Sequence, residues 1–223
     1  MSSFSKPIFI FGAGEIAQIA RYYFEHLDNR KVVAYTTDRE FITEAVVDGV
    51  PVVPSDELIE RFPPSDFDCF IGISYQLMNQ TRASKCDEMR RAGYTLATFF
   101  HPDVRRYNIV LGDNSLILEN NTIQPFVKLG NNVFLWSGNH IGHHTTIEDD
   151  VFISSHVVIG GGATIGRGTF LGLNVTIFDH LTIGEKSLIG AGAIIGQDIP
   201  NESVVVASLN KPSSISSSMI RRF

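Results

Sequence analysis

Between residues 111 and 200 the chain repeats a six-residue pattern of apolar and small positions without a slip. Every sixth residue in this run is leucine or isoleucine: Leu111, Ile117, Ile123, Leu129, Leu135, Ile141, Ile147, Ile153, Ile159, Ile165, Leu171, Ile177, Ile183, Ile189 and Ile195. The next position is rich in glycine, and the position four after is usually small or β-branched. A helix would repeat at about 3.6 residues and a half-buried strand at about 2, so neither explains the period. The pattern predicts a parallel β-helix with one flat side per hexad, in which fifteen hexads make about five triangular coils.

The first hundred residues have a different pattern, in which short apolar runs alternate with helical ones. The run 7–11 suits a buried strand, the stretch 12–14 a tight glycine turn, and the residues up to 27 a helix. Further strands are predicted at 32–36, 50–53, 67–73 and 95–100, with helices opening near residue 55 and covering 77–92. This alternation predicts a small Rossmann-like parallel sheet. We therefore divide the chain into an α/β domain at 1–104, a β-helix at 105–206 and a C-terminal tail at 207–223.

The glycine turn is a candidate ligand site. Gly12-Ala13-Gly14 joins a strand to a helix N-terminus, where backbone N–H groups and the helix dipole suit a phosphate. A nicotinamide dinucleotide would need an acidic residue at the end of the second strand, and Thr36 and Thr37 stand there instead. We therefore expect a nucleotide-linked ligand, with a purely structural turn as the alternative. The expected contacts are Gly12, Gly14, Thr36, Thr37, and the pair Ser74 and Tyr75 after the strand near residue 70, a pair that could equally cap a helix.

Composition and charge narrow the function classes. The net charge of −6 provides no positive surface for DNA, RNA or an anionic membrane. No apolar run is long enough for a transmembrane helix, and the N-terminus lacks a signal-peptide pattern, so we expect a cytoplasmic protein without membrane partners. Cys69 and Cys86 are the only cysteines, and they lie in an apolar strand-like run and a helix-like stretch, which argues against a disulfide framework.

Histidines are concentrated in the middle of the hexad run. Four of the seven lie within seventeen residues: His140, His143, His144 and His156. His143 and His144 are the third and fourth residues of their hexad, and one coil of eighteen residues further on stand two glycines, Gly161 and Gly162. An imidazole would therefore face bare backbone about 4.8 Å away. Acyl transfer can use this arrangement, with His143 as general base and an unobstructed N–H of Gly161 as oxyanion donor, although a structural role remains an equal alternative for any single histidine.

An α/β domain followed by a β-helix resembles the plan of the bacterial hexapeptide-repeat sugar acyltransferases. These include the bacillosamine and perosamine N-acetyltransferases and the sialic acid O-acetyltransferases. In that family the catalytic histidine lies in Ile-Gly-His-acid-Cys followed by Ile-Gly-Asp, and residues 141–149 align with it without gaps. The alignment places the general base on His143 and the oxyanion donor on Gly161. The resemblance implies left-handed coils and a homotrimer.

The resemblance also implies the ligands. Acetyl-CoA would lie in the groove between two prisms of the trimer, near Gly161, Gly172 and Ala191, and no metal ion would be needed. The α/β domain would hold a nucleotide-linked amino sugar, and the substrate contacts would include Asn139, His144 and His156. His143 would take the proton as the amine attacks the thioester directly, in the biosynthesis of sugars for O-antigen, capsule or other glycans.

The chain departs from the family pattern at four places. The usual acidic residue after the catalytic histidine is His144 here, so the base would be oriented by Asn139, by Glu148 or by no group visible in the sequence. The first loop lacks a ligand-facing histidine, and Thr36 and Thr37 replace two aspartates. Residues 207–210 replace the Gly-x-Pro-Ala that borders the CoA adenine. These differences leave the identity of the nucleotide open.

Three other functions are compatible with the same pattern. A hydroxyl sugar could be the acceptor on this scaffold. A zinc enzyme like the gamma-class carbonic anhydrases would need clustered ligands, yet His144 and His180 lie two coils, or about 10 Å, apart, too far for Zn–N bonds of about 2.0–2.1 Å. The chain could also be a non-catalytic scaffold in which the β-helix only trimerises the α/β domain.

Overall fold

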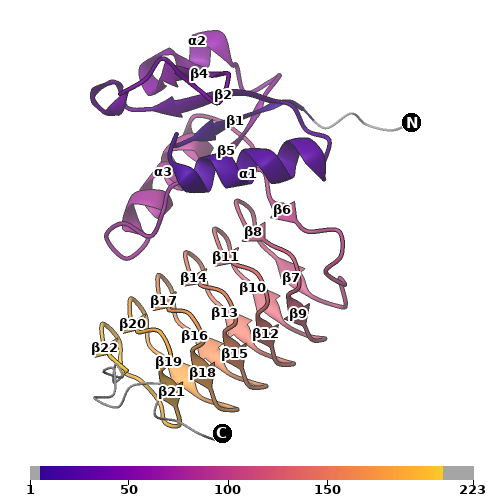
Figure 1. The fold of residues 1–223 in the computed structure, drawn as a ribbon, viewed down its shortest axis with the longest axis vertical. Helices are drawn as coiled ribbons and strands as arrows, with labels where there is room; N and C mark the ends of the chain where they lie inside the picture. The colour runs from indigo at the N-terminus through magenta and orange to yellow at the C-terminus, as the bar shows by residue number, and fades with distance from the viewer. Residues whose placement is uncertain (1–5, 208–223) are drawn as a thin grey trace, which may run out of the picture.

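The structure, a computed structural model, describes residues 6–207. Two parts stack along the long axis of the molecule: a sheet with its helices, and below it a prism of short strands (Figure 1). The predicted fold class, an α/β domain followed by a parallel β-helix, is confirmed. Of the C-terminal tail predicted at 207–223, including the stretch that replaces Gly-x-Pro-Ala, everything after Ala207 lies outside the described residues.

The α/β part has one five-stranded sheet with the order β3-β4-β2-β1-β5. Its elements are β1 (Ile8–Phe11), α1 (Glu15–His26), β2 (Val32–Thr37), β3 (Val46–Val47), β4 (Val50–Pro54), α2 (Leu58–Arg61), β5 (Asp68–Ile71) and α3 (Gln80–Arg91), with 3-10 turns at Arg39–Phe41 and Ser55–Glu57. β1 lies inside the sheet, between β2 and β5, because its residues are all apolar, and each is at most 2% exposed. Only β3 runs antiparallel to its neighbour, through a tight hairpin in which Asp48 and Gly49 both have positive φ. The parallel sheet matches the sequence prediction, and the antiparallel edge is an addition to it.

The prism has three faces of two-residue strands. Face 1 consists of β7 (Val110–Leu111), β10 (Lys128–Leu129), β13 (Thr146–Ile147), β16 (Thr164–Ile165) and β19 (Thr182–Ile183). Face 2 consists of β6 (Phe99–Phe100), β8 (Leu116–Ile117), β11 (Phe134–Leu135), β14 (Phe152–Ile153), β17 (Phe170–Leu171), β20 (Leu188–Ile189) and β22 (Val204–Val205). Face 3 consists of β9 (Thr122–Ile123), β12 (His140–Ile141), β15 (Val158–Ile159), β18 (Thr176–Ile177) and β21 (Ile194–Ile195). Lys128 pairs with Thr146 and His140 with Val158, eighteen residues apart, so the predicted coil length is confirmed.

The repeating aliphatic residues fill the axis of the prism. After Leu111, the hexad leucines and isoleucines are all at most 4% exposed. The small or β-branched position of each hexad is buried beside them, as at Val151, Val157 and Ala163. Burying one aliphatic side chain of this size stabilises the fold by about 1.5–3 kcal/mol. The repeat therefore supports every coil to a similar extent.

The α/β part packs on face 2 because that face alone presents large apolar side chains outward along most of its length. Leu116, Phe134 and Phe152 belong to one buried cluster with Phe24 of α1 and Phe70 of β5. The rings of Phe134 and Phe70 are stacked, with their centroids 5.8 Å apart. The corresponding outward positions of face 1 are mostly threonine or lysine, and they offer no such surface.

The boundary between the two parts passes through the strand that the sequence predicts at 95–100. Leu96 forms a bridge with Cys69 of the α/β sheet, whereas β6 pairs with β8 in face 2. The β-helix therefore begins at Phe99, earlier than the predicted boundary at 104/105, because this phenylalanine continues the apolar column of face 2.

Buried polar contacts hold the α/β part in one position on the prism. Arg82 of α3 is fully buried, donates from Nε to Oδ1 of Asn132 at 2.8 Å, and lies 4.0 Å from the centroid of the Phe134 ring. Burial lowers the pKa of Arg82 to about 10. One turn of the prism away, the Asn114 amide accepts the N–H of Ile71 and donates to its carbonyl oxygen. These bonds join α3 and β5 to neighbouring coils.

Two further observations concern the predicted compartment and redox state. Among residues 6–207 no helix is both long and apolar enough to cross a bilayer. Cys69 and Cys86 are buried as free thiols. Burial raises the pKa of the Cys86 thiol to about 12, so this side chain stays protonated and chemically inert at neutral pH.

Candidate active site

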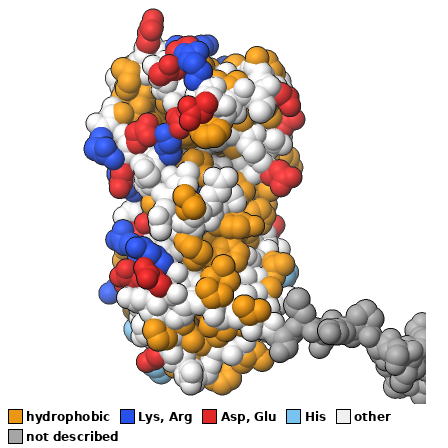
Figure 2. All heavy atoms as spheres, turned by 90° about the vertical axis from the view of Figure 1, so that its left-hand side faces the viewer, with side chains coloured by type: hydrophobic (Ala, Val, Ile, Leu, Met, Phe, Trp, Pro, Cys, Tyr) orange, Lys and Arg blue, Asp and Glu red, His pale blue; other side chains and the backbone are white. Residues whose placement is uncertain are grey.

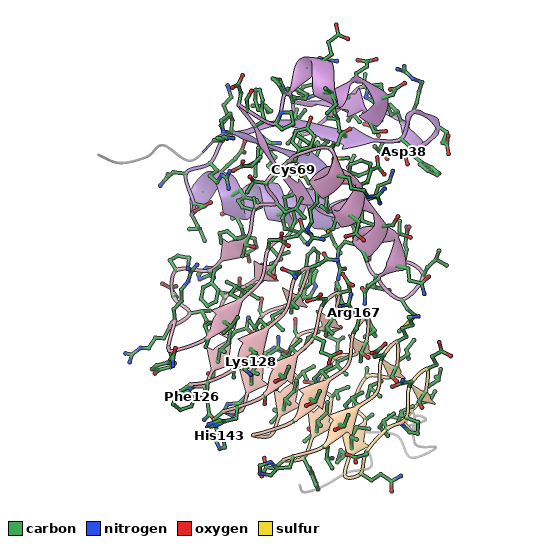
Figure 3. All side chains as sticks on the ribbon, turned by 180° about the vertical axis from the view of Figure 1, so that it is seen from behind. Asp38, Cys69, Phe126, Lys128, His143 and Arg167 are labelled. Carbon is green, nitrogen blue, oxygen red and sulfur yellow. The ribbon has the colours of Figure 1, made fainter. Side chains whose placement is uncertain are left out.

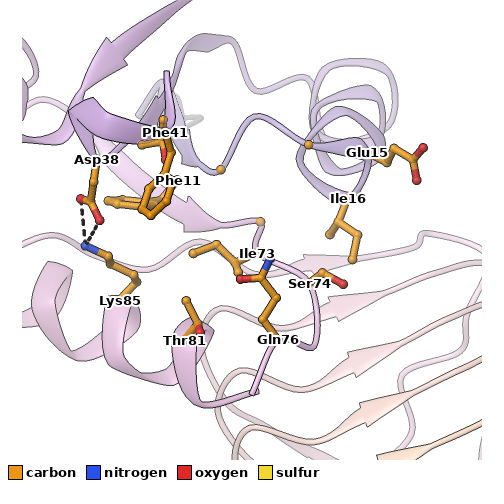
Figure 4. A pocket seen from close by; sticks show the side chains of 14 residues that line it. Phe11, Glu15, Ile16, Asp38, Phe41, Ile73, Ser74, Gln76, Thr81 and Lys85 are labelled. Atoms are coloured by element: carbon orange, nitrogen blue, oxygen red, sulfur yellow. Dashed lines mark hydrogen bonds and ion pairs between the residues drawn. The ribbon is translucent and has the colours of Figure 1, made fainter. Parts of the chain in front are cut away.

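A cavity of about 440 Å³ opens at the carboxyl ends of β1, β2 and β5 (Figure 4). Four residues named from the sequence line it, Gly12, Gly14, Thr37 and Ser74. In an open α/β sheet, ligands bind at this edge where the strand order reverses, which here is between β1 and β5. The structure therefore brings these four residues together around a space large enough for part of a nucleotide.

The glycine turn is shaped by its close approach to the end of β5. Gly12 has a φ of +113°, and a Cβ there would lie 2.9 Å from the carbonyl oxygen of Gly72. Gly14 is the N-cap of α1, has open space around it and provides no side chain to cap the helix. The N–H groups of the first turn of α1 are thus available to an anionic ligand in the cavity.

A charged pair, Asp38 and Lys85, closes one end of the cavity (Figure 4). The Lys85 ammonium lies 3.0 Å from the Asp38 carboxylate, which also accepts the Ser55 hydroxyl at 2.7 Å. Burial alone would raise the pKa of Asp38, but the hydrogen bonds from Ser55 and Lys85 outweigh it and hold this pKa below its usual value. Sequence reasoning missed Lys85, which lies on α3 far from the glycine turn, and the only signal for it was the helical pattern there.

Two of the predicted substrate contacts lie elsewhere. Thr36 is fully buried, and its hydroxyl donates to the carbonyl oxygen of Val53 at 2.7 Å. Its side chain is therefore part of the sheet packing, and the prediction that it contacts substrate is wrong. Tyr75 is half exposed and packs against Phe152 and Phe170 of face 2, outside the cavity at the glycine turn.

His143 and His144 lie at the corner where face 3 turns into face 1, and both are exposed. The His143 ring lies directly against the backbone of Gly161, since a Cβ on that glycine would be 2.6 Å from Cε1 and 2.9 Å from Nε2 of the ring. The predicted stacking of an imidazole on bare glycine backbone is confirmed. Figure 3 shows His143 and Phe126 on the same edge of the prism.

The prediction that Gly161 offers an unobstructed N–H is wrong. This N–H donates to Oδ1 of Asp179 at 2.8 Å, and the next one, of Gly162, donates to the His143 carbonyl oxygen at 2.8 Å. Asp179 is the third residue of its hexad, one coil beyond Gly161, so its carboxylate reaches back over the same corner. In the described conformation the oxyanion donor expected at Gly161 is occupied.

The group that contacts the His143 ring is His144. The two Nδ1 atoms are 3.1 Å apart, and the ring planes are nearly perpendicular. The two alternatives from the sequence are wrong, because their side chains are engaged elsewhere. Glu148 accepts the N–H of Arg167 at 2.9 Å. Asn139 is 1% exposed, donates to the Trp136 carbonyl oxygen and accepts the N–H of Val157, so it also cannot reach a substrate.

A second groove, of about 500 Å³, runs along face 2 below the α/β part. Its lining consists of Tyr75, Trp136, Phe152, Ser154, Ser155, Phe170, Gly172, Leu173 and Ala191. Figure 2 shows hydrophobic side chains continuing down this side of the prism. Gly172 and Ala191, two of the three residues expected near CoA, therefore line an aromatic surface. We call it the aromatic groove.

The predicted site residues of the prism lie at two different corners. Gly172, Ala191 and His156 follow strands of face 2, whereas His143 and Gly161 follow strands of face 3. The His156 ring packs on the backbone of Gly138. The full width of face 3 separates the two corners, so one chain does not bring all these residues together.

The described part of the chain contains no group of three or more histidine, cysteine or acidic side chains placed to hold a metal ion. His144 and His180 occupy the same hexad position two coils apart. The glycine between them, Gly162, lies against the His180 ring. The Gly162 backbone thus lies between the two imidazoles, and they do not converge on one point.

Comparisons with known proteins identify the repeat and the fold. A family model for bacterial transferase hexapeptide repeats (six repeats) matches residues 144–179, and no curated protein matches the chain by sequence. Perosamine N-acetyltransferase from Caulobacter crescentus, solved as a mutant with CoA and GDP-perosamine, superposes with a TM-score of 0.82 at 22% identity, over 90% of this chain and 93% of its own. This chain has its fold. The acetyltransferase domain of PglB from Neisseria gonorrhoeae gives 0.82 at 23% identity, over 94% of this chain and 100% of that one.

A third structure of the same fold extends the comparison. WeeI from Acinetobacter baumannii superposes with a TM-score of 0.70 at 19% identity, over 91% of this chain and 97% of its own. The fold inferred from the resemblance, an α/β domain followed by a hexapeptide-repeat β-helix, is therefore confirmed for nearly the whole chain. At these identities the likeness establishes the fold, and the activity has to be argued from the site.

Proposed function

We propose that this chain is an acyltransferase that moves the acetyl group of acetyl-CoA to the amino group of a nucleotide-linked amino-deoxysugar. The observation that carries the proposal is the exposed His143 ring, placed against bare backbone at a corner of a rigid prism. The cavity at the glycine turn, with a free helix N-terminus, supports a nucleotide as the handle of the substrate. A protein of the same fold was solved with CoA and GDP-perosamine, which supports the same pair of ligands here.

His143 would act as a general base in a direct transfer. The sugar amine attacks the thioester carbonyl carbon, and Nε2 of His143 accepts the proton that the amine loses. The C–S bond then breaks, and the CoA sulfur takes this proton from the His143 imidazolium and leaves as the thiol. A positioned base of this kind contributes about a hundredfold to ten-thousandfold in rate. The thioester is already activated, so positioning supplies most of the remainder. Gly161 is given no part in this scheme, because its N–H is held by Asp179.

The active enzyme would be a homotrimer whose sites lie between two prisms. His143 and the aromatic groove are on opposite sides of face 3, so a second copy is needed to bring an aromatic groove to each His143. Face 3 and its corners carry exposed apolar side chains suited to such contact, among them Val158, Ile194 and Phe178. Chains with His143→Asn and chains with Ala191→Trp, each inactive alone, would then regain activity when they are assembled together.

The test is a screen of UDP-, dTDP- and GDP-linked 3- and 4-amino-deoxysugars with acetyl-CoA, in which release of free thiol is measured. We expect turnover with at least one amine and a loss of at least about a hundredfold in kcat on His143→Asn, because the base is removed. Inactivity of the whole panel, with the matching hydroxyl sugars accepted, would replace N-acetylation with O-acetylation. Full activity of the His143→Asn chain would contradict the proposed role of this histidine.

The place of the reaction in the cell follows from the substrate class. A nucleotide-linked amino sugar is an activated building block, so its acetylation would precede transfer of the sugar to a growing glycan such as O-antigen or capsule. We place this reaction in the cytoplasm, the compartment expected from the sequence. Detection of the acetylated nucleotide sugar in cell extracts that contain the active chain, and its loss with His143→Asn, would test this placement.

A further inference from the structure

The contact between His143 and His144 limits where the proton of each ring can be. Their Nδ1 atoms are 3.1 Å apart, and a neutral imidazole carries one N–H and one lone pair. If His143 donates from Nδ1, its Nε2 keeps a lone pair and can act as a base. If His144 donates instead, the proton of His143 is forced onto Nε2, and the ring cannot accept another one there. The direction of this single bond therefore decides whether His143 is a competent base.

The backbone and the neighbouring coils hold His144 in position. It has a φ of +60°, and its N–H donates to the Pro125 carbonyl oxygen at 3.3 Å. Its ring packs on that of Phe126, the residue at the same hexad position one coil before, with centroids 4.7 Å apart. The His143 N–H is fixed in turn by Oε1 of Gln124 at 2.8 Å. Both rings are thus presented by ordered backbone, and their contact does not depend on a long flexible side chain.

Building on the proposed function, we propose that His144 is a positioning residue that accepts the Nδ1–H of His143 and so keeps Nε2 of His143 free to act as the base. It does this without a negative charge, unlike the carboxylate that the resemblance leads one to expect at this position. The imidazolium formed on His143 during transfer is therefore stabilised by a lone pair alone.

The charged groups around the pair come from the next coil. The Asp179 carboxylate lies on the N–H of Gly161, opposite the His143 ring, and His180 lies against Gly162. Phe126 and Gln124 on the preceding coil carry no charge. The Asp179 carboxylate is thus bound to backbone, which leaves the His144 ring as the partner of Nδ1 of His143.

Two substitutions separate the role of the acceptor from the effect of the left-handed backbone. His144→Asn keeps an acceptor oxygen and tolerates a positive φ, whereas His144→Leu has no acceptor. Lys186→Leu is the matched control, because Lys186 has the same hexad position with a φ of +52° and is exposed at a different corner. We expect kcat to fall about tenfold to a hundredfold in His144→Leu, with KM for acetyl-CoA changed less than about twofold, because a base held in the wrong tautomer affects the transition state and not binding. His144→Asn should recover most of kcat.

The tautomer itself can be measured without turnover. Long-range proton–nitrogen NMR of the full-length protein, with His143 assigned by His143→Asn, should show the wild-type proton on Nδ1 of His143, and this state should persist in His144→Asn but not in His144→Leu. A wild-type proton on Nε2, or a His144→Leu chain with unchanged kcat and tautomer, would overturn the proposal. If the sugar panel gives no turnover, the proposed function fails while the NMR result still decides the role of His144.

Discussion

Gly161→Ala is the sharpest test of the catalytic corner, because it changes only the space beside the His143 ring. The φ of Gly161 is not positive, so alanine fits its backbone. The added Cβ would lie 2.6 Å from Cε1 of His143, against an ordinary contact that begins at 3.4 Å, so the ring must move by about 0.8 Å. A displacement of about 1 Å at a reacting group costs about a hundredfold in rate. We therefore expect kcat to fall by roughly two orders of magnitude.

The assay is steady-state thiol release with the best amino sugar, together with thermal unfolding. Overpacking costs about 1–3 kcal/mol, so the prism should remain folded and its melting temperature should fall only modestly. Gly196→Ala is the matched control, since a Cβ there meets nothing closer than 3.7 Å and its φ is also not positive. Wild-type kcat in a folded Gly161→Ala chain would refute the reasoning, because the reaction would then be insensitive to the position of the ring.

Three further predictions concern other contacts. Asp179→Ala frees the N–H of Gly161 and removes a negative carboxylate from the corner. We therefore expect kcat to be retained and KM for acetyl-CoA to fall in steady-state assays. A large loss of kcat would mean that the carboxylate itself takes part in the reaction. Arg82→Met removes a buried charge together with its hydrogen bonds to Oδ1 and to the carbonyl oxygen of Asn132, of which Oδ1 keeps the Asn114 amide as a donor. Urea unfolding should therefore show a loss of about 1–3 kcal/mol in the free energy of unfolding, and an unchanged value would contradict this. The pKa of Asp38 lies below its ordinary value of 3.8, so its contribution to stability is present above pH 3.8 and is lost as the pH falls through the folded pKa. Asp38→Asn should therefore lose less stability than the wild type in acid titrations below pH 3.8, and equal losses would exclude this contribution.

The hexad period predicted the prism because the same physical requirement repeats along its length: each hexad must place one aliphatic side chain on the axis. Once the coil contains eighteen residues, the column positions follow by addition, which is why His143 could be placed against Gly161. The glycine turn was predictable for a similar reason, since the close approach of Gly12 to β5 requires a residue without a side chain.

What the sequence did not predict are contacts that depend on side-chain rotamers. The register places Asp179 one coil beyond Gly161, but only the rotamer brings its carboxylate onto that N–H. The family resemblance implied a ligand contact for Asn139, yet the amide oxygens of Asn139 and Asn121 accept buried backbone N–H groups of neighbouring coils. Lys85 reaches the cavity from α3 because of how the helix packs on the sheet, and no local pattern encodes that approach.

The coil register described above also limits how the molecule can change its reach. Each added coil lengthens the prism by the same rise of about 4.8 Å, so the span between the cavity at the glycine turn and a histidine corner can be adjusted only in whole steps. The proposed nucleotide-linked substrate would have to match one of these steps. Insertion of one complete coil would therefore favour a substrate with a longer link between its nucleotide and its reacting group. The chemistry at the corner would be unchanged, so the number of coils would set the length of substrate that fits.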